Sequence, residues 1–518
     1  MKKFFRKLFS PLFITAIISL IEIGVVVTAL FLLSTYLDSL SEKDVLLYLL
    51  ARAVAIVVFL IIVNKRENPE YKIPWIILLF VFPILAIVLY FFFANHGLRR
   101  RDRKILKQIN EQLDVLFDVN EEEKFQFRET VPLRYRSIFK YLRKVTRLHN
   151  ACNNRVTYYK NGETFFPALV ESLKKAKEFI FMEFFIIGEG KWWSEIEKIL
   201  IEKAKEGVEV RLVYDDLGCF GILPNNYAKK LRKLGISCYR FHSFKPFLSG
   251  TYNNRDHRKI AIIDHKEAYT GGMNLADEYA NDEVRFGYWK DTMIKVEGAG
   301  ISNFIATFLE NYDLASHSVS DYSKYVVYDY EQFDESGYVY MFGDGPGGFS
   351  GNEPIGEENY LQIINRADRT LWISSPYLIP TYRLMEALKN AAKRGVDVRL
   401  FVPGIPDKKA VYWLAKSNFN ELTKAGVHVF IYKPGFNHEK QMVADGILAF
   451  CGTINFDFRS LVHHFECGVT MYDVPCISDM VADFKEMREV SQEVKVGYSL
   501  NVFQKLMISV LSIFRALL

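Results

Sequence analysis

The stretch His257-Arg258-Lys259-Ile260-Ala261-Ile262-Ile263-Asp264 occurs in this chain a second time, as His438-Glu439-Lys440-Gln441-Met442-Val443-Ala444-Asp445. Both copies fit the pattern His-x-Lys-x4-Asp. A turn of small residues and an asparagine follow each copy at the same spacing, Asn274 after the first and Asn455 after the second. Two such matches in one chain are not expected by chance. They predict that one fold is used twice.

The rest of the chain after residue 150 supports this duplication. Gly207–Leu212 matches Gly395–Leu400, and each follows an amphipathic helical stretch, 196–206 or 383–394. The short apolar runs 179–184 and 371–376 suit buried strands. Helices that alternate with strands favour an α/β fold. We therefore expect two duplicated lobes, each a mixed sheet flanked by helices, with a catalytic cleft between them.

The N-terminal part of the chain has a different composition. Residues 11–37, 45–63 and 73–93 are nearly unbroken apolar runs, each long enough to cross a bilayer as a helix. The first run is too long for a secretory signal, and no small-residue cleavage site follows it. We expect residues 1–95 to form a transmembrane anchor of two or three apolar helices.

The remaining boundaries follow from charge and from the repeat. We expect a basic juxtamembrane linker at 96–150, lobes at 151–326 and 327–498, and an amphipathic membrane-associated tail at 499–518. The linker's basic residues form either a solvated face or a surface attracted to anionic headgroups. The tail is either a helix in the membrane interface or a helix docked on the lobes. Of the 518 residues six are cysteines without C-x-x-C spacing, as expected in a reducing compartment.

The motif residues match the needs of a reaction at a phosphodiester. The anionic oxygens must be neutralised, a nucleophile supplied and the leaving oxygen protonated. On a strand, residues two apart point to the same side, so His257 lies beside Lys259 and His438 beside Lys440. The lysines can neutralise charge, Asn274 and Asn455 can bind substrate, and the histidines can attack and donate a proton. The sequence shows no metal-ligand cluster, so we expect neither a metal nor another cofactor.

At this point the residues resemble a known family. The paired motifs are similar to the phospholipase D superfamily, and the resemblance to membrane-anchored bacterial cardiolipin synthases runs along almost the whole chain. The stretches that carry it are 214–218, 244–255, 271–278, 344–347, 374–377 and 452–460. Departures are small: Thr453 stands where Ser is common, and Glu439 occupies a position that is usually small.

The resemblance implies roles for the residues. His257 is the expected nucleophile and His438 the expected acid and base, a choice that the residues alone leave open. Asp291 and Glu466, one downstream of each motif, are expected to orient the histidines. Asp264 and Asp445 belong to the motif's catalytic set, although we expect them to hold a turn. His463 and His464 lie outside the motif and are not included.

The resemblance also implies a reaction and a location. We expect transfer of a phosphatidyl group between two phosphatidylglycerol molecules through a phosphohistidine, giving cardiolipin and glycerol. The alternatives are a hydrolytic phospholipase D, a phosphatidyltransferase with another alcohol, a nuclease and a non-catalytic scaffold. The expected partners are phosphatidylglycerol and the membrane, not nucleic acid, since the net charge is only +5. The expected location is the bacterial inner membrane, with several crossings and cytoplasmic lobes, because Arg99–Lys104 is the larger basic flank.

Overall fold

The computed structural model describes residues 42–65, 69–93, 98–117, 127, 129–148, 151–152, 154–242, 254–327, 330–333, 335–346, 353–497 and 500–513. The chain divides into two compact units. The smaller contains residues 1–96 with two short later segments, and the larger contains most of the chain from residue 97 onward.

The smaller unit is helical in the described residues of its N-terminal part. It contains α3 (Glu42–Asn64), α4 (Pro69–Val81) and α5 (Pro83–Phe93). The apolar run 73–93 is thus two helices rather than one, because Pro83 has no amide hydrogen to continue the first. Over the described part of the chain, no helix combines the length and the apolar character needed to cross a membrane. The expected membrane spans are therefore not confirmed, and the run 11–37 lies outside the described residues.

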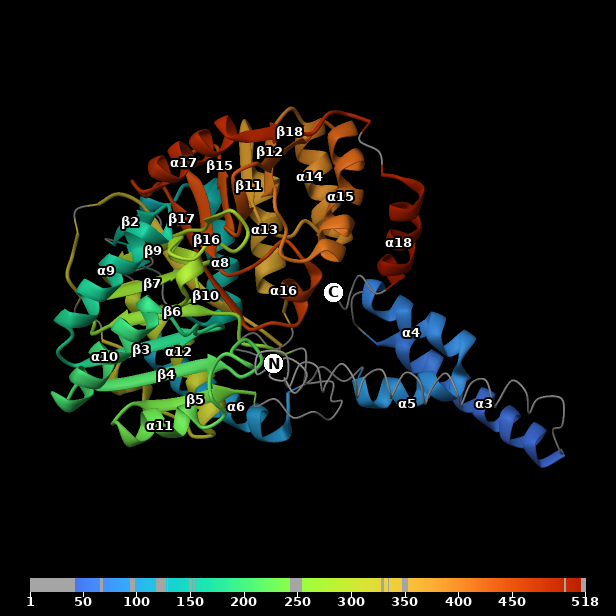
Figure 1. The fold of residues 1–518 in the computed structure, drawn as a ribbon, viewed down its shortest axis with the longest axis horizontal. Helices are drawn as coiled ribbons and strands as arrows, with labels where there is room; N and C mark the ends of the chain where they lie inside the picture. Colours follow the sequence, from blue (N-terminus) through green and yellow to red (C-terminus); the bar gives the residue numbers. More distant parts are fainter. Residues whose placement is uncertain are drawn as a thin grey trace, which may run out of the picture. The chain divides into compact units, whose positions relative to one another are not determined.

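The first lobe is built on a mixed sheet. Its seven described strands run in the order β2-β9-β7-β6-β3-β4-β5. They are β2 (Arg155–Tyr159), β3 (Phe179–Phe184), β4 (Glu209–Asp215), β5 (Ser237–Phe241), β6 (Lys259–Ile263), β7 (Glu267–Gly271) and β9 (Met293–Glu297). The helices of this part are α9 (Gly162–Lys175), α10 (Lys191–Lys205), α11 (Tyr227–Lys233) and α12 (Ile301–Ser316). Figure 1 shows these strands in teal and green.

The second lobe repeats this arrangement. Its described strands run in the order β1-β10-β17-β16-β15-β11-β12-β13-β18. They are β1 (Ala151–Cys152), β10 (Tyr338–Asp344), β11 (Thr370–Ser374), β12 (Asp397–Pro403), β13 (His428–Tyr432), β15 (Gln441–Ala444), β16 (Leu448–Gly452), β17 (Glu466–Tyr472) and β18 (Ser491–Glu493). The helices are α13 (Ile355–Arg366), α14 (Tyr382–Lys393), α15 (Lys409–Lys424), α16 (Phe458–Val462), α17 (Ile477–Glu489) and α18 (Val502–Ile513).

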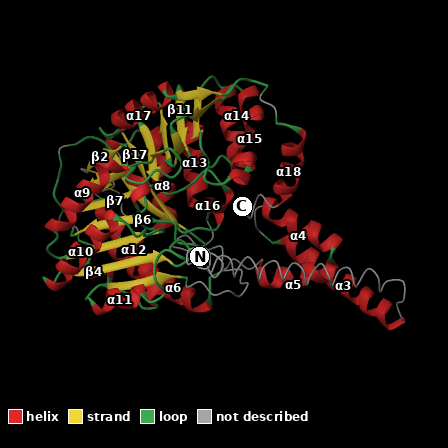
Figure 2. Ribbon diagram, in the orientation of Figure 1, coloured by secondary structure: helices red, strands yellow, loops and turns green. Residues whose placement is uncertain are grey.

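The two sheets share an order of seven strands: β2-β9-β7-β6-β3-β4-β5 matches β10-β17-β16-β15-β11-β12-β13, and β1 and β18 are added at the edges of the second sheet. Figure 2 shows the strands in yellow with helices in red beside them. In both, the strand after the motif lies antiparallel to the first buried strand, β6 on β3 and β15 on β11. That buried strand pairs in parallel with the next, β3 with β4 and β11 with β12. The expectation of two duplicated α/β lobes with mixed sheets is confirmed.

Local sequence signals explain the repeated helix ends. Gly207 follows α10 and Gly395 follows α14, with φ of 93° and 94°. In this left-handed region glycine carries no steric penalty. The amide of each glycine donates to a carbonyl of the last helical turn, over 3.2 Å from Gly207 to Ala204 and 2.9 Å from Gly395 to Ala392. Each helix therefore ends three residues before the next strand, at the same place in both lobes.

The core extends across both lobes. Helix α12 contacts strands of the first sheet and also β10 of the second, and nearly all its side chains are buried. Residues 96–150, which the sequence suggested as a linker, supply α6 (Arg100–Leu116) and α8 (Leu133–Thr146) to this core. Helix α6 packs on α12, and α8 packs on α13 and β10. Their apolar faces, including Ile109 and Phe139, are fully buried. These helices are therefore part of the larger unit.

The C-terminal tail also contacts the second lobe. Helix α18 packs on α15, where Ile508 meets Leu414 and Ile379. The described residues of the tail thus contact the second lobe, and the association of the tail with the membrane stays a prediction. Val502 is exposed at the start of the helix.

Candidate active site

The two lobes are joined at the segments that carry the motifs. A short parallel ladder pairs β8 (Tyr288–Lys290) of the first lobe with β14 (Gly435–Asn437) of the second. Directly after it, the amide of His438 donates to the carbonyl of Lys290 over 2.7 Å. In the other motif, the amide of His257 donates to the carbonyl of Phe465 over 2.8 Å. Each histidine is therefore held by the backbone of the opposite lobe.

Both histidines precede their strands instead of lying in them. Strand β6 begins at Lys259 and β15 at Gln441. The histidines therefore lie in the extended segments that lead into the strands, and the shared side of each His and Lys stays a prediction. Lys259 Nζ donates to the backbone carbonyl of His257 over 2.6 Å. Lys440 Nζ bonds the carbonyl of His438 in the same way.

The carboxylates expected to orient the histidines do contact them, and the pairing is crossed between the lobes. His257 Nδ1 lies 2.9 Å from both carboxylate oxygens of Glu466, which is in the second lobe. His438 Nδ1 lies 2.6 Å from Oδ2 of Asp291, which is in the first lobe. A carboxylate at Nδ1 holds a proton there and leaves Nε2 free to act as nucleophile or base. Each imidazole is thus complete only when both lobes are present.

The burial of the site keeps its bases neutral. Both histidines are only 7% exposed. Burial, followed by the charge of the adjacent lysine, lowers the pKa of His257 and of His438 well below the usual value. Burial also lowers the pKa of Lys259 to about 8 and that of Lys440 to about 7. An anionic phosphate beside these groups would favour their protonated forms.

The partner carboxylates are shifted in the opposite direction. Burial raises the pKa of Asp291 to about 7, although Lys440 opposes this shift. Burial also raises the pKa of Glu466, against the charge of Lys259 and hydrogen bonds from the hydroxyls of Ser460 and Thr453. The site therefore holds several titratable groups whose pKa values have moved toward neutrality, as is common where protons are transferred.

The motif aspartates lie away from the histidines. Asp264 accepts hydrogen bonds from the amides of Lys177, Glu178 and Phe179 at the start of β3. Asp445 accepts them from the amides of Asp368, Arg369 and Thr370 at the start of β11. Each aspartate comes directly after its strand, at the end opposite to the histidine, and has a positive φ. Their inclusion in the catalytic set is corrected: each binds the backbone at the start of the neighbouring strand.

The two asparagines are buried close to the site. Asn274 accepts from the amide of Ile186 over 2.9 Å and donates to the hydroxyl of Tyr279 over 2.7 Å. The ring of Tyr279 in turn lies against His438. Asn455 Oδ1 is buried without a hydrogen-bond partner among the described residues. A role for either amide in binding substrate stays a prediction.

His464 is a residue of this site that the sequence reasoning left out. Its ring centroid lies 5.4 Å from that of His257, and its Nδ1 lies 3.5 Å from Oε1 of Glu466. Possible ligand atoms of these three residues all lie within 4.8 Å of one another, which is close enough to hold a metal ion. The available signal was its position two residues before the orienting Glu466. It was discounted because it lies outside the repeated pattern.

Comparison with known families agrees with this geometry. A family model described as "Cardiolipin synthase, PLD-like domain" matches residues 169–292 and 360–488, one segment in each lobe. A second, described as "Phospholipase_D-nuclease N-terminal", matches residues 53–95. A protein named cardiolipin synthase 2 from Bacillus anthracis is 32% identical over 84% of this chain and 84% of its own. The chain belongs to the cardiolipin synthase family.

Other members and one solved structure extend the comparison. A cardiolipin synthase of a Geobacillus species is 33% identical over 84% of this chain and 86% of its own length. An uncharacterized protein of Streptococcus mutans is 39% identical over 84% of this chain and 93% of its own. The crystal structure of a phosphatidylserine synthase from Haemophilus influenzae has the same fold, with a TM-score of 0.57 at 14% identity over 74% of this chain and 97% of that one. Membership in the cardiolipin synthase family places the chain among phosphatidyltransferase enzymes.

Proposed function

We propose that this protein is a cardiolipin synthase that transfers a phosphatidyl group from one phosphatidylglycerol to another. The observation that carries the proposal is the crossed pairing of His257 with Glu466 and of His438 with Asp291. This pairing supplies two oriented imidazoles. Lys259 and Lys440, each bonded to the backbone carbonyl of its motif histidine, can balance the charge of a phosphodiester. Because the chain belongs to the cardiolipin synthase family, we take the phosphodiester substrate to be a phospholipid.

In the first step, Nε2 of His257 attacks phosphorus and forms a nitrogen–phosphorus bond. The bond from phosphorus to the glycerol oxygen breaks, and His438 in its protonated form gives its proton to that oxygen. The negative lipid phosphate favours this protonated form. Glu466 stabilises the positive charge that develops on His257 as it attacks. The products of this step are glycerol and a phosphatidyl group on His257.

In the second step, the terminal hydroxyl of another phosphatidylglycerol gives its proton to His438 and attacks phosphorus. The nitrogen–phosphorus bond breaks and cardiolipin is released. His257 returns to its neutral state and His438 to its protonated state, so nothing is consumed except the two lipids. We assign the nucleophile to His257 on the family resemblance, since the geometry gives both histidines equivalent partners.

The burial of the site supports transfer to an alcohol over transfer to water. Both histidines and both lysines are nearly inaccessible in the described structure. Exclusion of water limits the hydrolysis of a reactive intermediate. Glycerol is a small leaving group, and the lipid that replaces it brings its own apolar surface into the site.

We also propose that the smaller unit holds the enzyme at the bacterial inner membrane, with the lobes on the cytoplasmic side. Helices α3, α4 and α5 expose many large apolar side chains, and such side chains gathered on one part of a protein are typical of contact with a membrane or a protein. Examples are Leu49, Ile56, Leu60, Ile77, Phe80 and Phe91. Both proposed substrates are lipids of the bilayer, so this placement brings the site to them.

The product from labelled phosphatidylglycerol tests the proposal. The full-length protein in lipid vesicles should convert it to cardiolipin and glycerol in equal amounts. Phosphatidic acid as the main product would show that the enzyme is a hydrolytic phospholipase D. A new phospholipid formed only with another added alcohol would show a different acceptor, and cleavage of DNA or RNA would show a nuclease.

A further inference from the structure

The residue between His and Lys differs in the two motifs, and in both it is buried. Arg258 and Glu439 are each 0% exposed. Their side chains point away from the catalytic groups, as alternation along an extended chain requires. Since a buried charge is costly unless it is paired, the partners of these two residues show what they hold in place.

Arg258 reaches the segment that carries Glu466. Its Nε donates to the backbone carbonyl of Glu466 over 3.0 Å. Its other nitrogens contact the carbonyls of Thr307 and Asp344 and a carboxylate oxygen of Glu310, the last over 2.7 Å. Glu466 is the carboxylate that contacts His257, the histidine next to Arg258. Arg258 thus holds the backbone of Glu466, whose carboxylate contacts His257, the residue before Arg258.

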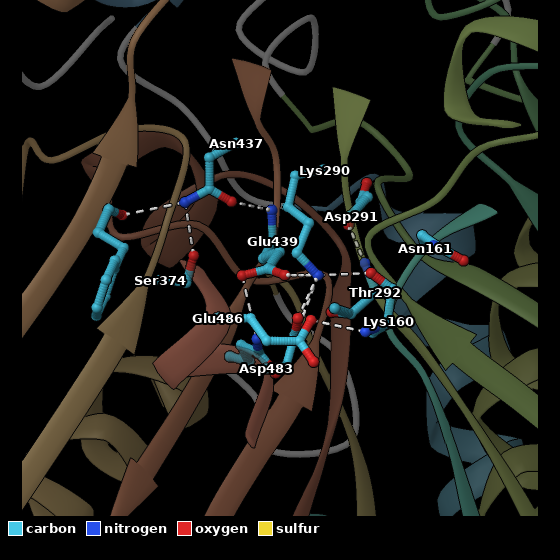
Figure 3. Close-up of polar contacts among 12 residues, drawn as sticks. Lys160, Asn161, Lys290, Asp291, Thr292, Ser374, Asn437, Glu439, Asp483 and Glu486 are labelled. Carbon is cyan, nitrogen blue, oxygen red and sulfur yellow. Dashed lines mark hydrogen bonds and ion pairs between the residues drawn. The ribbon is translucent and has the colours of Figure 1, made fainter. Parts of the chain in front are cut away.

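Glu439 makes the equivalent contact in the other motif, through a lysine (Figure 3). Lys290 Nζ lies 2.9 Å from Oε1 of Glu439 and 2.7 Å from Oδ2 of Asp483. Lys290 also donates to the backbone carbonyl of Lys160 over 2.6 Å. It directly precedes Asp291, the carboxylate that contacts His438, the histidine next to Glu439. The first motif uses an arginine hydrogen bond and the second an ion pair with a lysine. In both, the contact reaches the segment that carries the carboxylate for the motif's histidine.

We propose that the residue between His and Lys in each motif is a positioning residue, which fixes the opposite lobe's carboxylate on the histidine of its own motif. Arg258 acts in this way on Glu466 and His257, and Glu439 acts through Lys290 on Asp291 and His438. The proposal rests on the proposed function, in which His257 is the nucleophile and His438 the acid and base. It gives a role to the residue between His and Lys, which takes no part in the two proposed reaction steps.

The two contacts have separable consequences. Loss of the Glu439 contact impairs only the proton transfers of His438, whereas loss of the Arg258 contact impairs attack by His257. A substrate whose leaving group needs no proton distinguishes them. Phosphatidyl-p-nitrophenol is such a substrate, because p-nitrophenolate leaves without general acid help. A general loss of structure would impair phosphatidylglycerol and the p-nitrophenyl ester equally.

The test uses Glu439→Leu, which removes the contact but leaves Lys290 paired with Asp483. We expect its turnover of phosphatidylglycerol to fall about 10- to 100-fold, within the range for a misplaced catalytic group. Single-turnover release of p-nitrophenolate, with enzyme in excess, should stay within about twofold of the wild-type rate, because this step needs no proton from His438. Glu439→Gln should restore phosphatidylglycerol turnover, because its amide oxygen can still accept a hydrogen bond from Lys290 Nζ.

The matched control is Glu486→Gln. Glu486 forms an ion pair with Lys160 at the exposed edge of the same cluster, and exposed pairs contribute little. This variant should match wild type with both substrates. If Glu439→Leu does not fold, Lys290→Gln is tested in its place. The amide of the new glutamine can still donate a hydrogen bond to one of the two carboxylates that Lys290 contacts, Glu439 or Asp483. The same difference between the two substrates is expected.

Two results would overturn the positioning role. One is a folded Glu439→Leu protein with wild-type turnover of phosphatidylglycerol. The other is a folded variant that loses both activities by the same factor. Failure of the proposed function looks different, because the wild-type enzyme itself would then make no cardiolipin from phosphatidylglycerol.

Discussion

Replacing Asp291 with asparagine should reverse the hydrogen bond that prepares His438. Asp291 accepts from His438 Nδ1 through Oδ2, and its Oδ1 accepts from the amide of Thr292 over 2.8 Å. Because that amide needs an acceptor, the asparagine should place its oxygen there and its NH2 group toward His438. The NH2 group can only donate, so Nδ1 must lose its proton and Nε2 must carry it. His438 can then neither accept a proton at Nε2 nor become doubly protonated.

The expected loss of turnover with phosphatidylglycerol is about 10³- to 10⁴-fold, the size of the effect of a wrong histidine tautomer in a serine protease. Stability should not fall with it. Burial raises the pKa of Asp291 to about 7, so the folded state disfavours the charged carboxylate above the pKa of the unfolded chain. The neutral amide removes this cost, and the thermal midpoint at pH 8 should equal or exceed that of wild type.

The assay measures the initial rate of cardiolipin formation from labelled phosphatidylglycerol, beside a thermal melt of the same sample. The matched control is Asp313→Asn, another buried carboxylate of the first lobe, which hydrogen-bonds Ser320 instead of a histidine. This control should retain turnover. An Asp291→Asn enzyme with more than about a tenth of the wild-type rate would refute the account, because a tautomer change of this kind costs far more.

Three further predictions follow from the same contacts. Asp264→Ala should lower the thermal midpoint by several degrees while the folded enzyme keeps its turnover, because three amides lose their acceptor far from the histidines; a lost turnover at full stability would contradict this. The profile of kcat/KM against pH should be bell-shaped around neutrality, since Asp291 is protonated as pH falls through about 7 and Lys440 loses its charge as pH rises through about 7; a flat profile from pH 5 to 9 would be inconsistent with it. A chelator should leave turnover unchanged, but added Zn²⁺ should inhibit it by binding His257, His464 and Glu466. His464→Ala should weaken this inhibition, and inhibition of equal strength in the variant would count against the site.

The duplicated fold was accessible from the sequence because its signals are local and occur twice. Gly207 and Gly395 mark the same helix end, and the apolar runs at 179–184 and 371–376 mark the same buried strand. Each repeated signal supports the other. The two copies therefore predict the same strands and helices from the sequence alone.

The crossed pairing was not accessible, because it depends on how two lobes meet. Asp291 and Glu466 were expected to orient the histidines, but nothing in the chain order shows that each serves the opposite lobe's motif. The packing of α6 and α8 was missed because their basic surfaces conceal a buried apolar face. Arg258 was given no role from the sequence, and Glu439 was noted only as a departure from the family pattern, because their partners lie across the interface.

The most direct test of the central claim is to trap the covalent intermediate. Full-length enzyme is mixed with phosphatidylglycerol labelled at its phosphate, quenched under alkaline conditions that preserve phosphohistidine, and digested for mass spectrometry. We predict label on His257 in wild type, more label in His438→Ala, where the second step lacks its base, and none in His257→Ala. Label on His438 instead, or continued cardiolipin synthesis by His257→Ala, would contradict the account.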